Sequence, residues 1–249
     1  KLLSKYNLKS KVAYIFDENG EYKTLIKEEI DEQVDFLANA IANRVSLNKK
    51  RQIRIFSVLR SSHESFILML ASAKMGAHHC ICFEELSEKA IQLRVEIFDP
   101  DIILFKKRIE IKVKKSVLKT FPKVPLMLLD SKDFRNDKSE YLKKEFIEYP
   151  YTTNSVLFTL FTSGSTGKPK AILHNASSYI NYSEFTTSYF FGLNKHSIMF
   201  TATDAGWING HTYSLYGPLI NESMVVIHEN LKLLSNPNLS LIHISEPTR

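Results

Sequence analysis

The sequence has little cysteine and no long apolar run. Two cysteines among 249 residues are too few for the disulfide framework that is typical of small secreted proteins. The longest apolar candidate covers residues 65–73 and ends at Lys74, which is far short of the length that crosses a bilayer. The chain begins at Lys1 rather than Met, and no signal peptide is recognisable. From these absences we expect a cytoplasmic protein with no membrane span.

Charge is present in ordinary amounts, but the basic residues are unevenly placed. The net charge is +6, and residues 106–123 hold eight basic residues and one acidic residue, so the remainder is close to neutral. Residues 108–114 alternate apolar with charged side chains, which predicts a half-exposed strand. No aromatic residue that could stack on bases interleaves with the lysines of residues 106–119, so we expect a solvated face and no nucleic-acid partner. Steeply salt-dependent binding would support the nucleic-acid alternative.

Strand-like and helix-like segments alternate through the first half of the chain. Apolar segments with strand character cover residues 11–16, 53–59, 77–83, 101–105, 125–130 and 156–161. Helical periodicity covers residues 24–45, with Thr24 as the N-cap, and residues 63–74 and 88–98. Further helices are expected over residues 176–191 and 213–219, and strands over 198–202 and 223–228. This order predicts an α/β fold with layers of helices on a mainly parallel sheet.

The segment His78-His-Cys-Ile-Cys82 raises the question of a metal site. In a strand His78, Cys80 and Cys82 would share one face. A second Cys/His cluster that would complete a zinc site is missing from the sequence. We therefore expect a buried strand whose cysteines act as small apolar residues, and no metal ligands.

The most informative stretch is Thr162-Ser-Gly-Ser-Thr-Gly-Lys-Pro-Lys170, which follows one apolar segment and precedes another. Its glycines and hydroxyls can turn donors toward an anion, and its lysines add positive charge, so a polyphosphate is the expected ligand. The spacing differs from the Walker A loop, because only two residues separate Gly164 from Gly167 and Pro169 follows Lys168. A plain surface hairpin is the alternative. A second block, residues 203–219, contains Trp207, the sole tryptophan.

The nine-residue stretch resembles the phosphate-binding signature of the AMP-forming acyl-CoA synthetases, within the adenylate-forming superfamily. The second block resembles the acetyl- and propionyl-CoA synthetase branch of that family. The resemblance implies that residues 1–238 form part of a layered α/β large N-terminal domain, the AMP-binding (adenylation) domain, with a subdomain break near residues 131–154. It also implies that the small C-terminal domain is absent. Residues 239–249 resemble the in-frame translation of a transposase sequencing adapter, so we expect them not to be native; a genuine strand and turn is the alternative.

The resemblance also implies roles for individual residues. The ATP and pyrophosphate ligands would be Thr162, Ser163, Gly164, Ser165, Thr166, Gly167 and Lys168. Trp207 and Ile208 would line the acyl pocket, and Asn209 and Arg108 would contact CoA. ATP, Mg²⁺ and CoA would be the cofactors, and a small carboxylate the substrate. The family's catalytic lysine lies beyond residue 238, so no catalytic residue is expected in this chain, which would be inactive alone.

The sequence departs from the family pattern at three places. Ala171 replaces a glycine, as it often does in the acetoacetyl-CoA branch, and Asn209 stands where acetyl-CoA synthetases have threonine. Residues 83–87 read Phe-Glu-Glu-Leu-Ser where the family commonly has Phe-Gly-Gly-Phe-Ser beside CoA. We expect an ATP-dependent ligase that joins acetate or propionate to CoA. The alternatives are an acetoacetyl-CoA or medium-chain acyl-CoA synthetase and a non-catalytic phosphate-binding remnant.

Overall fold

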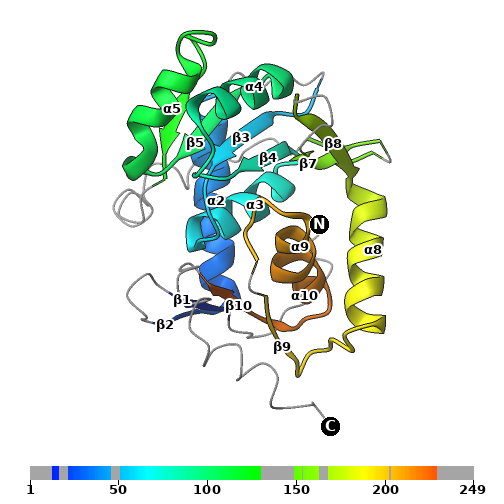
Figure 1. Cartoon of the computed structure of the whole chain (residues 1–249). Helices are drawn as coiled ribbons and strands as arrows, with labels where there is room; N and C mark the ends of the chain where they lie inside the picture. The colour runs from blue at the N-terminus through cyan, green and yellow to red at the C-terminus, as the bar shows by residue number, and fades with distance from the viewer. Residues whose placement is uncertain are drawn as a thin grey trace.

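The computed structural model describes residues 13–16, 22–45, 51–129, 149–152, 154–162, 168–201 and 203–228. The described strands form a six-stranded sheet and a smaller four-stranded sheet, and helices pack on both (Figure 1). Residues 130–148, 163–167 and 229–249 lie outside the described part. The expected domain end at residue 238, the native status of residues 239–249 and the subdomain break near residues 131–154 therefore stay predictions.

The larger sheet has the strand order β6-β5-β3-β4-β7-β8. Its members are β3 (Arg54–Val58), β4 (His78–Cys82), β5 (Ile102–Phe105), β6 (Leu126–Leu128), β7 (Val156–Thr162) and β8 (Lys170–Asn175). All neighbouring pairs are parallel except β7 and β8, which pair antiparallel. Parallel strands of this kind are joined by crossover helices, as the alternating sequence pattern predicts.

Helices cover both faces of this sheet. The pair α2 (Lys27–Ala42) and α3 (His63–Lys74) packs with one set of strand side chains, including Ile55 and Leu104. The pair α4 (Glu88–Phe98) and α5 (Glu110–Val117) packs with the other set, including Phe56 and Phe105. Because alternate residues of a buried strand point to opposite faces, both faces are apolar. The expected layered α/β fold is confirmed.

The smaller sheet brings together strands from the two ends of the described chain. Its order is β2-β1-β10-β9, built from β1 (Ala13–Phe16), β2 (Tyr22–Leu25), β9 (Ile198–Phe200) and β10 (Met224–His228). Strands β1 and β2 form the antiparallel hairpin, whereas β10 pairs parallel with β1 and with β9. The first and last described strands, β1 and β10, are therefore hydrogen-bonded neighbours.

The helix α8 (Ala176–Tyr189) runs along the side of the molecule, beside a second helical segment (Figure 1). That segment is continuous and comprises α9 (Ile208–His211), a π-helical turn η2 (Thr212–Tyr216) and α10 (Gly217–Ile220). The expected helix over residues 213–219 thus begins five residues earlier, at Ile208. π-Helical turns inside α-helices are frequent at functional sites.

The expectation of a strand over residues 108–114 is wrong. A short 3₁₀ turn, η1 (Lys107–Ile109), leads into α5. Ile109, Val113 and Val117 recur every four residues and are buried against α4, whereas Ile111 is 73% exposed. Over this short stretch the apolar residues fit both the two-residue alternation of a strand and the repeat of a helix. The helical repeat continues to Val117, and the segment forms a helix.

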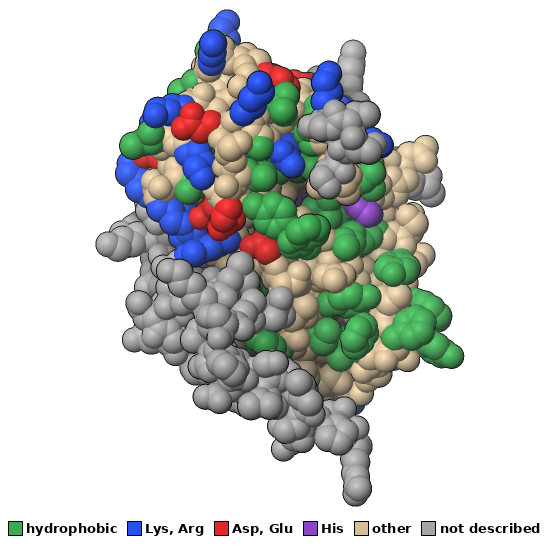
Figure 2. All heavy atoms as spheres, in the orientation of Figure 1, with side chains coloured by type: hydrophobic (Ala, Val, Ile, Leu, Met, Phe, Trp, Pro, Cys, Tyr) green, Lys and Arg blue, Asp and Glu red, His purple; other side chains and the backbone are tan. Residues whose placement is uncertain are grey.

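One smaller expectation also needs correction. Thr24 does not cap α2, because it pairs with Tyr14 in the β1–β2 hairpin; the helix begins after Ile26, whose backbone N–H donates to the Glu29 carboxylate at 3.0 Å. Among the aromatic residues of α8, only Tyr179 is buried. Exposed aromatic residues gather on and just after this helix, on the right of Figure 2: Tyr182, Phe185, Tyr189, Phe190 and Phe191.

The histidine- and cysteine-containing segment forms strand β4. Cys80 and Cys82 are free thiols buried between the sheet and α4, and burial raises the pKa of Cys80 well above its usual range. Within the described residues, no three His, Cys, Asp or Glu side chains lie close enough together to hold a metal ion. The helices of the described part include none that is long and apolar enough to cross a membrane.

Candidate functional site

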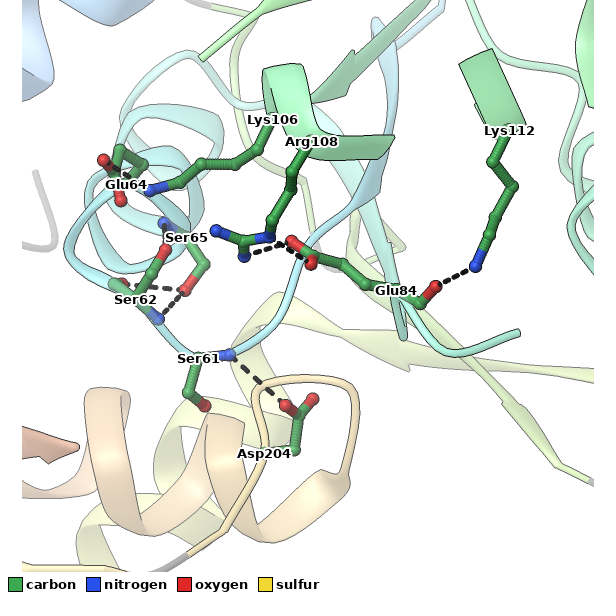
Figure 3. A network of polar contacts seen from close by, with 9 residues as sticks. All are labelled: Ser61, Ser62, Glu64, Ser65, Glu84, Lys106, Arg108, Lys112 and Asp204. Carbon is green, nitrogen blue, oxygen red and sulfur yellow. Dashed lines mark hydrogen bonds and ion pairs between the residues drawn. The ribbon is translucent and has the colours of Figure 1, made fainter. Parts of the chain in front are cut away.

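The candidate site lies where the parallel strands of the larger sheet end. The carboxyl ends of β3, β4, β5 and β7 point to one edge, because these strands run in the same direction. In open α/β sheets, ligands bind in the crevice outside this edge. The segments that follow the strands here carry hydroxyl, carboxylate and basic side chains, several of which Figure 3 shows in contact.

The expected phosphate-binding stretch connects β7 to β8 at this edge. The two strands stay in register up to the pair formed by Thr162 and Lys170. Thr162 and Lys168 are both exposed on either side of residues 163–167, which lie outside the described part. The structure thus places the two ends of the stretch at the site, whereas the roles of Thr162, Lys168 and the five residues between them stay predictions.

The second block docks onto the same edge through Ser61, which follows β3. The Asp204 carboxylate accepts hydrogen bonds from the backbone N–H groups of Ser61 (3.3 Å) and Gly206 (2.7 Å). The Ser61 hydroxyl donates to the Thr203 carbonyl at 3.1 Å and accepts from the Ala205 N–H at 2.8 Å. Burial raises the pKa of Asp204, while its two backbone hydrogen bonds act in the opposite direction. These contacts fix the start of the block against the sheet (Figure 3).

The glycines of the block are required by close packing. A Cβ on Gly210 would lie 2.3 Å from the Asp204 carbonyl oxygen, and one on Gly217 would lie 2.4 Å from Thr187 on α8. A Cβ on Gly206 would meet the Phe83 ring at 2.6 Å. Real Cβ atoms do not approach other heavy atoms this closely, so the glycine pattern of the block follows from how tightly it packs on its neighbours.

A buried group of aromatic rings and histidines lies behind the block. The Phe158 ring of β7 contacts His211 at a centroid distance of 4.0 Å, His174 at 4.5 Å and Tyr179 at 4.6 Å. His211 is fully buried, and its Nδ1 lies 3.2 Å from the Trp207 carbonyl oxygen. Burial lowers the pKa of His211 to about 3, so its imidazole is neutral at physiological pH. We therefore interpret His211 as a packing residue.

A cavity of about 450 Å³ opens beside this group. Its lining includes Leu173, His174, Ser178, Tyr179, Tyr182 and Ile208. Ile208 therefore faces a cavity, whereas its expected role in binding the acyl group stays a prediction. Leu173, Ser178 and Tyr182 were not foreseen as lining residues, because nothing in their local sequence indicates that β8, α8 and α9 surround one cavity.

Trp207 does not line that cavity. Its side chain is 61% exposed and packs on Phe83, with a ring-centroid distance of 5.4 Å. Phe83 directly follows β4 and is half-buried, so the two rings form an aromatic pair at the carboxyl edge of the sheet in which Trp207 is the exposed member. Trp207 and Ile208, which the family resemblance assigns to one acyl pocket, thus have different surroundings. Asn209, next to Ile208, is exposed.

Arg108, the other expected CoA contact, is bound to a carboxylate of this chain. Its Nε and one terminal nitrogen each donate to the Glu84 carboxylate at 2.7 Å (Figure 3). Lys106 forms a second ion pair with Glu64 at 2.6 Å. Burial acts to raise the pKa of Glu64, but the contacts with Lys106 act to lower it and prevail, so the pKa lies below its usual value. The sequence signal for this arrangement was the replacement of glycine by glutamate at position 84, but sequence alone did not identify its partner.

Comparison with known proteins agrees with this geometry. The model of the family described as AMP-binding enzyme matches residues 5–248, so the chain belongs to that family. Acetyl-coenzyme A synthetase 1 of Candida albicans is 30% identical, and the match covers 92% of this chain and 36% of that protein. Acetyl-coenzyme A synthetase of Helicobacter acinonychis (strain Sheeba) is 29% identical and is matched over 89% of this chain and 37% of its own length. The chain thus spans little more than a third of either relative.

Solved structures share the fold. The crystal structure of Brucella canis acyl-CoA synthetase superposes with a TM-score of 0.78 at 16% identity, covering 98% of this chain and 45% of that one. The fatty acyl-adenylate ligase from L. pneumophila, solved in complex with acyl adenylate and pyrophosphate, gives 0.77 at 19% identity, with 98% and 42% covered. These neighbours share the expected layered α/β fold.

Proposed function

We propose that the complete protein to which this chain belongs is an AMP-forming acyl-CoA synthetase. In the first step, an oxygen of a small carboxylate attacks the α-phosphorus of ATP, and pyrophosphate leaves. In the second, the thiol of CoA attacks the acyl carbon of the adenylate, and AMP leaves. The first step brings two anions together, so the protein must orient the reactants and offset phosphate charge.

One observation carries this proposal: the phosphate-binding stretch and the second block converge on one sheet edge. Thr162 and Lys168 flank the stretch there, and Asp204 anchors the block to Ser61 at the same edge. In the proposed role, Thr162, Ser163, Ser165, Thr166 and Lys168 hold the β- and γ-phosphates and stabilise the departing pyrophosphate, with Gly164 and Gly167 shaping the loop. Family membership supports this assignment.

The cavity beside Ile208 is the proposed acyl site. Its walls are largely apolar, and His174, Ser178 and Tyr182 offer polar atoms for orienting a carboxylate. Similarity to acetyl-coenzyme A synthetases favours acetate or propionate as the substrate. The volume favours a second candidate, a synthetase for acetoacetate or a medium-chain acid, because about 450 Å³ falls within the range of roughly 300–1,000 Å³ that accommodates much larger ligands.

The acceptor thiol would approach along the exposed side of the block. Trp207 and Phe83 present an aromatic surface there, and Asn209 lies exposed one residue beyond Ile208. These positions support Asn209 as a proposed CoA contact. They also favour a role for Trp207 beside the approaching CoA thiol and not in the acyl pocket. Arg108 lies on the same edge but is held by Glu84, so it does not offer an open phosphate site.

Mg²⁺ is expected for this chemistry, but the described residues do not provide its ligands. No group of three carboxylate, histidine or cysteine side chains lies together among them. Magnesium is commonly bound through substrate phosphates and only one or two carboxylates. We therefore assign no residue of the described part to the ion; when bound, it would offset phosphate charge in the first step.

Acid-dependent exchange of pyrophosphate into ATP tests the proposal, because exchange needs the first step only. With the complete protein, acetate or propionate should support exchange, and Lys168→Ala should reduce it by at least tenfold through loss of a charge-assisted contact to phosphate. Lys119→Ala removes an exposed lysine remote from the site and serves as the matched control. Exchange with octanoate alone would reject the short-chain assignment, and unchanged exchange in Lys168→Ala would reject the loop assignment.

A further inference from the structure

The three basic residues directly after β5 are each paired with a carboxylate. Lys106 pairs with Glu64 at 2.6 Å, Lys107 with Glu110 at 2.5 Å, and Arg108 with Glu84 at 2.7 Å. The sequence alone showed a basic stretch at this point, for which we expected a solvated face. In the folded protein, its first three positive charges are balanced within the chain.

Glu84 is the most closely held of these carboxylates. Its side chain is 7% exposed, whereas that of Arg108 is 37% exposed, so the carboxylate lies beneath the guanidinium. Both Glu84 oxygens accept from Arg108, and the Glu84 backbone carbonyl accepts from Lys112 Nζ at 2.7 Å (Figure 3). Two-point pairing of this kind is among the stronger polar contacts in proteins and fixes the orientation of the arginine.

We propose that Glu84 is a specificity-determining residue that suppresses recognition of a phosphomonoester by Arg108. This inference rests on the proposed function, since it concerns the acceptor thiol of the second step. CoA carries one phosphomonoester, on its ribose, and dephospho-CoA lacks it. The site therefore accepts both thiols with similar affinity, and Glu84 is the reason.

The physical argument is that two anions compete for one cation. A phosphate that displaced Glu84 would leave a buried carboxylate without its partner, which is strongly unfavourable. A phosphate that bound at the exposed side of Arg108 would be repelled by the carboxylate beneath it. In either case, the phosphomonoester gains little from Arg108, although the arginine is positioned at the site edge.

The neighbouring Glu85 provides a matched comparison. It carries the same charge one residue along the chain, but its side chain is exposed. Removing the charge of Glu85 changes the local field without releasing Arg108. An effect that belongs to Glu84 and not to Glu85 would identify direct pairing, and not general electrostatics, as the cause.

Calorimetric titration of the complete protein with CoA and with dephospho-CoA tests the proposal. The unaltered protein should bind CoA and dephospho-CoA with dissociation constants within about threefold of each other. The corresponding difference in binding free energy is smaller than the contribution of one charge-assisted hydrogen bond. Glu84→Gln keeps the shape of the side chain and removes its charge, and should tighten CoA binding about tenfold while leaving dephospho-CoA unchanged. In the double variant Glu84→Gln with Arg108→Gln, the ratio of the dissociation constants for CoA and dephospho-CoA should return to near one. In Glu85→Gln, that ratio should match the ratio of the unaltered protein.

Two results would overturn the inference. One is a preference of the unaltered protein for CoA over dephospho-CoA of more than tenfold, which needs no variant and so does not depend on how Glu84→Gln folds. The other is an unchanged ratio in a folded Glu84→Gln protein, which would leave the pair a structural contact between η1 and the end of β4. Pyrophosphate exchange, measured in parallel, needs no thiol; its absence would reject the proposed function while the titration still reports on Glu84.

Discussion

The Asp204 carboxylate accepts a hydrogen bond from the backbone N–H of Ser61, a residue 143 positions earlier in the chain. Asp204 opens the second block, and Ser61 follows strand β3 of the larger sheet. This contact, together with the Ser61 hydroxyl, joins the block to the sheet edge at which the phosphate-binding stretch begins. The two sequence motifs therefore lie at the same edge of the sheet, and a buried aspartate holds the second of them there.

Replacing Asp204 should destabilise the protein. Asp204→Ala leaves the N–H groups of Ser61 and Gly206 without their acceptor, and we expect a loss of about 2–4 kcal/mol in the free energy of unfolding. Asp204→Asn keeps one acceptor oxygen and should lose less. Urea denaturation followed by circular dichroism measures both, and an alanine variant as stable as the unaltered protein would show that the contact does not hold the block in place.

Stability should fall on mild acidification because of the buried histidine His211. Its pKa is lowered to about 3 in the folded protein, whereas an unfolded histidine titrates near 6.5, so the unfolded state binds a proton first. The stabilising contribution is complete above about pH 6.5 and is lost as the pH falls toward the folded value. Between about pH 7 and pH 5.5 each such histidine should lower the free energy of unfolding by about 1 kcal/mol.

The control for this effect is a histidine on the surface. His211→Gln should reduce the pH dependence of unfolding across that interval, whatever it does to stability at pH 7. His196→Gln, which alters an exposed side chain, should leave the dependence unchanged. Chemical denaturation at both pH values provides the comparison, and an unaltered slope in His211→Gln would mean that the imidazole is not held neutral by burial.

The glycine at position 210 should not tolerate a methyl group. Alanine normally favours a helix over glycine, but here its Cβ would lie 2.3 Å from the Asp204 carbonyl oxygen. We expect Gly210→Ala to lower the free energy of unfolding by about 1–3 kcal/mol through overpacking. Ser214→Ala, in the same helical segment, removes a buried hydroxyl that has no hydrogen-bond partner among the described residues, and should be neutral or stabilising. Equal stability of Gly210→Ala and the unaltered protein would contradict the packing argument.

A larger side chain at Ile208 should narrow the acid preference of the complete protein. Ile208 lines the cavity of about 450 Å³, so Ile208→Trp fills part of that space. If acids longer than propionate support pyrophosphate exchange, the exchange rate of the variant with these acids should fall by about tenfold or more, because a pocket too small for its ligand forces overpacking. The exchange rate with acetate should be retained. Leu118→Trp, at an exposed position on the other side of the sheet, is the size-matched control. Loss of acetate and longer acids in equal measure would place Ile208 outside the acyl site.

Local sequence patterns predicted those elements whose boundaries are marked locally. Helix α3 occupies the predicted residues 63–74 because Ser62 caps its start and Gly76, with a φ of 68°, follows its end. Helix α4 likewise occupies residues 88–98, where Ser87 caps the start. The segment after β5 was mistaken for a strand because two repeats fitted it equally well over a few residues.

Long-range relationships were beyond local patterns. Arg108 follows β5 at the carboxyl edge of the sheet, but its partner Glu84 lies 24 positions away and meets it only because β4 and β5 both end at this edge. The cavity is similar, since Leu173, Tyr182 and Ile208 come together through the packing of separate elements. Trp207 and Ile208 are adjacent in sequence yet face different surroundings, which only the start of a helix between them explains.

The central claim, that a carboxylate attacks the α-phosphorus of ATP, can be tested by following an oxygen atom. The complete protein would be supplied with ATP, CoA and acetate or propionate labelled with ¹⁸O in the carboxylate, and the products analysed by mass spectrometry. Attack at the α-phosphorus transfers one labelled oxygen to AMP in each turnover and leaves pyrophosphate unlabelled. Label in orthophosphate, with ADP as the nucleotide product, would contradict the account.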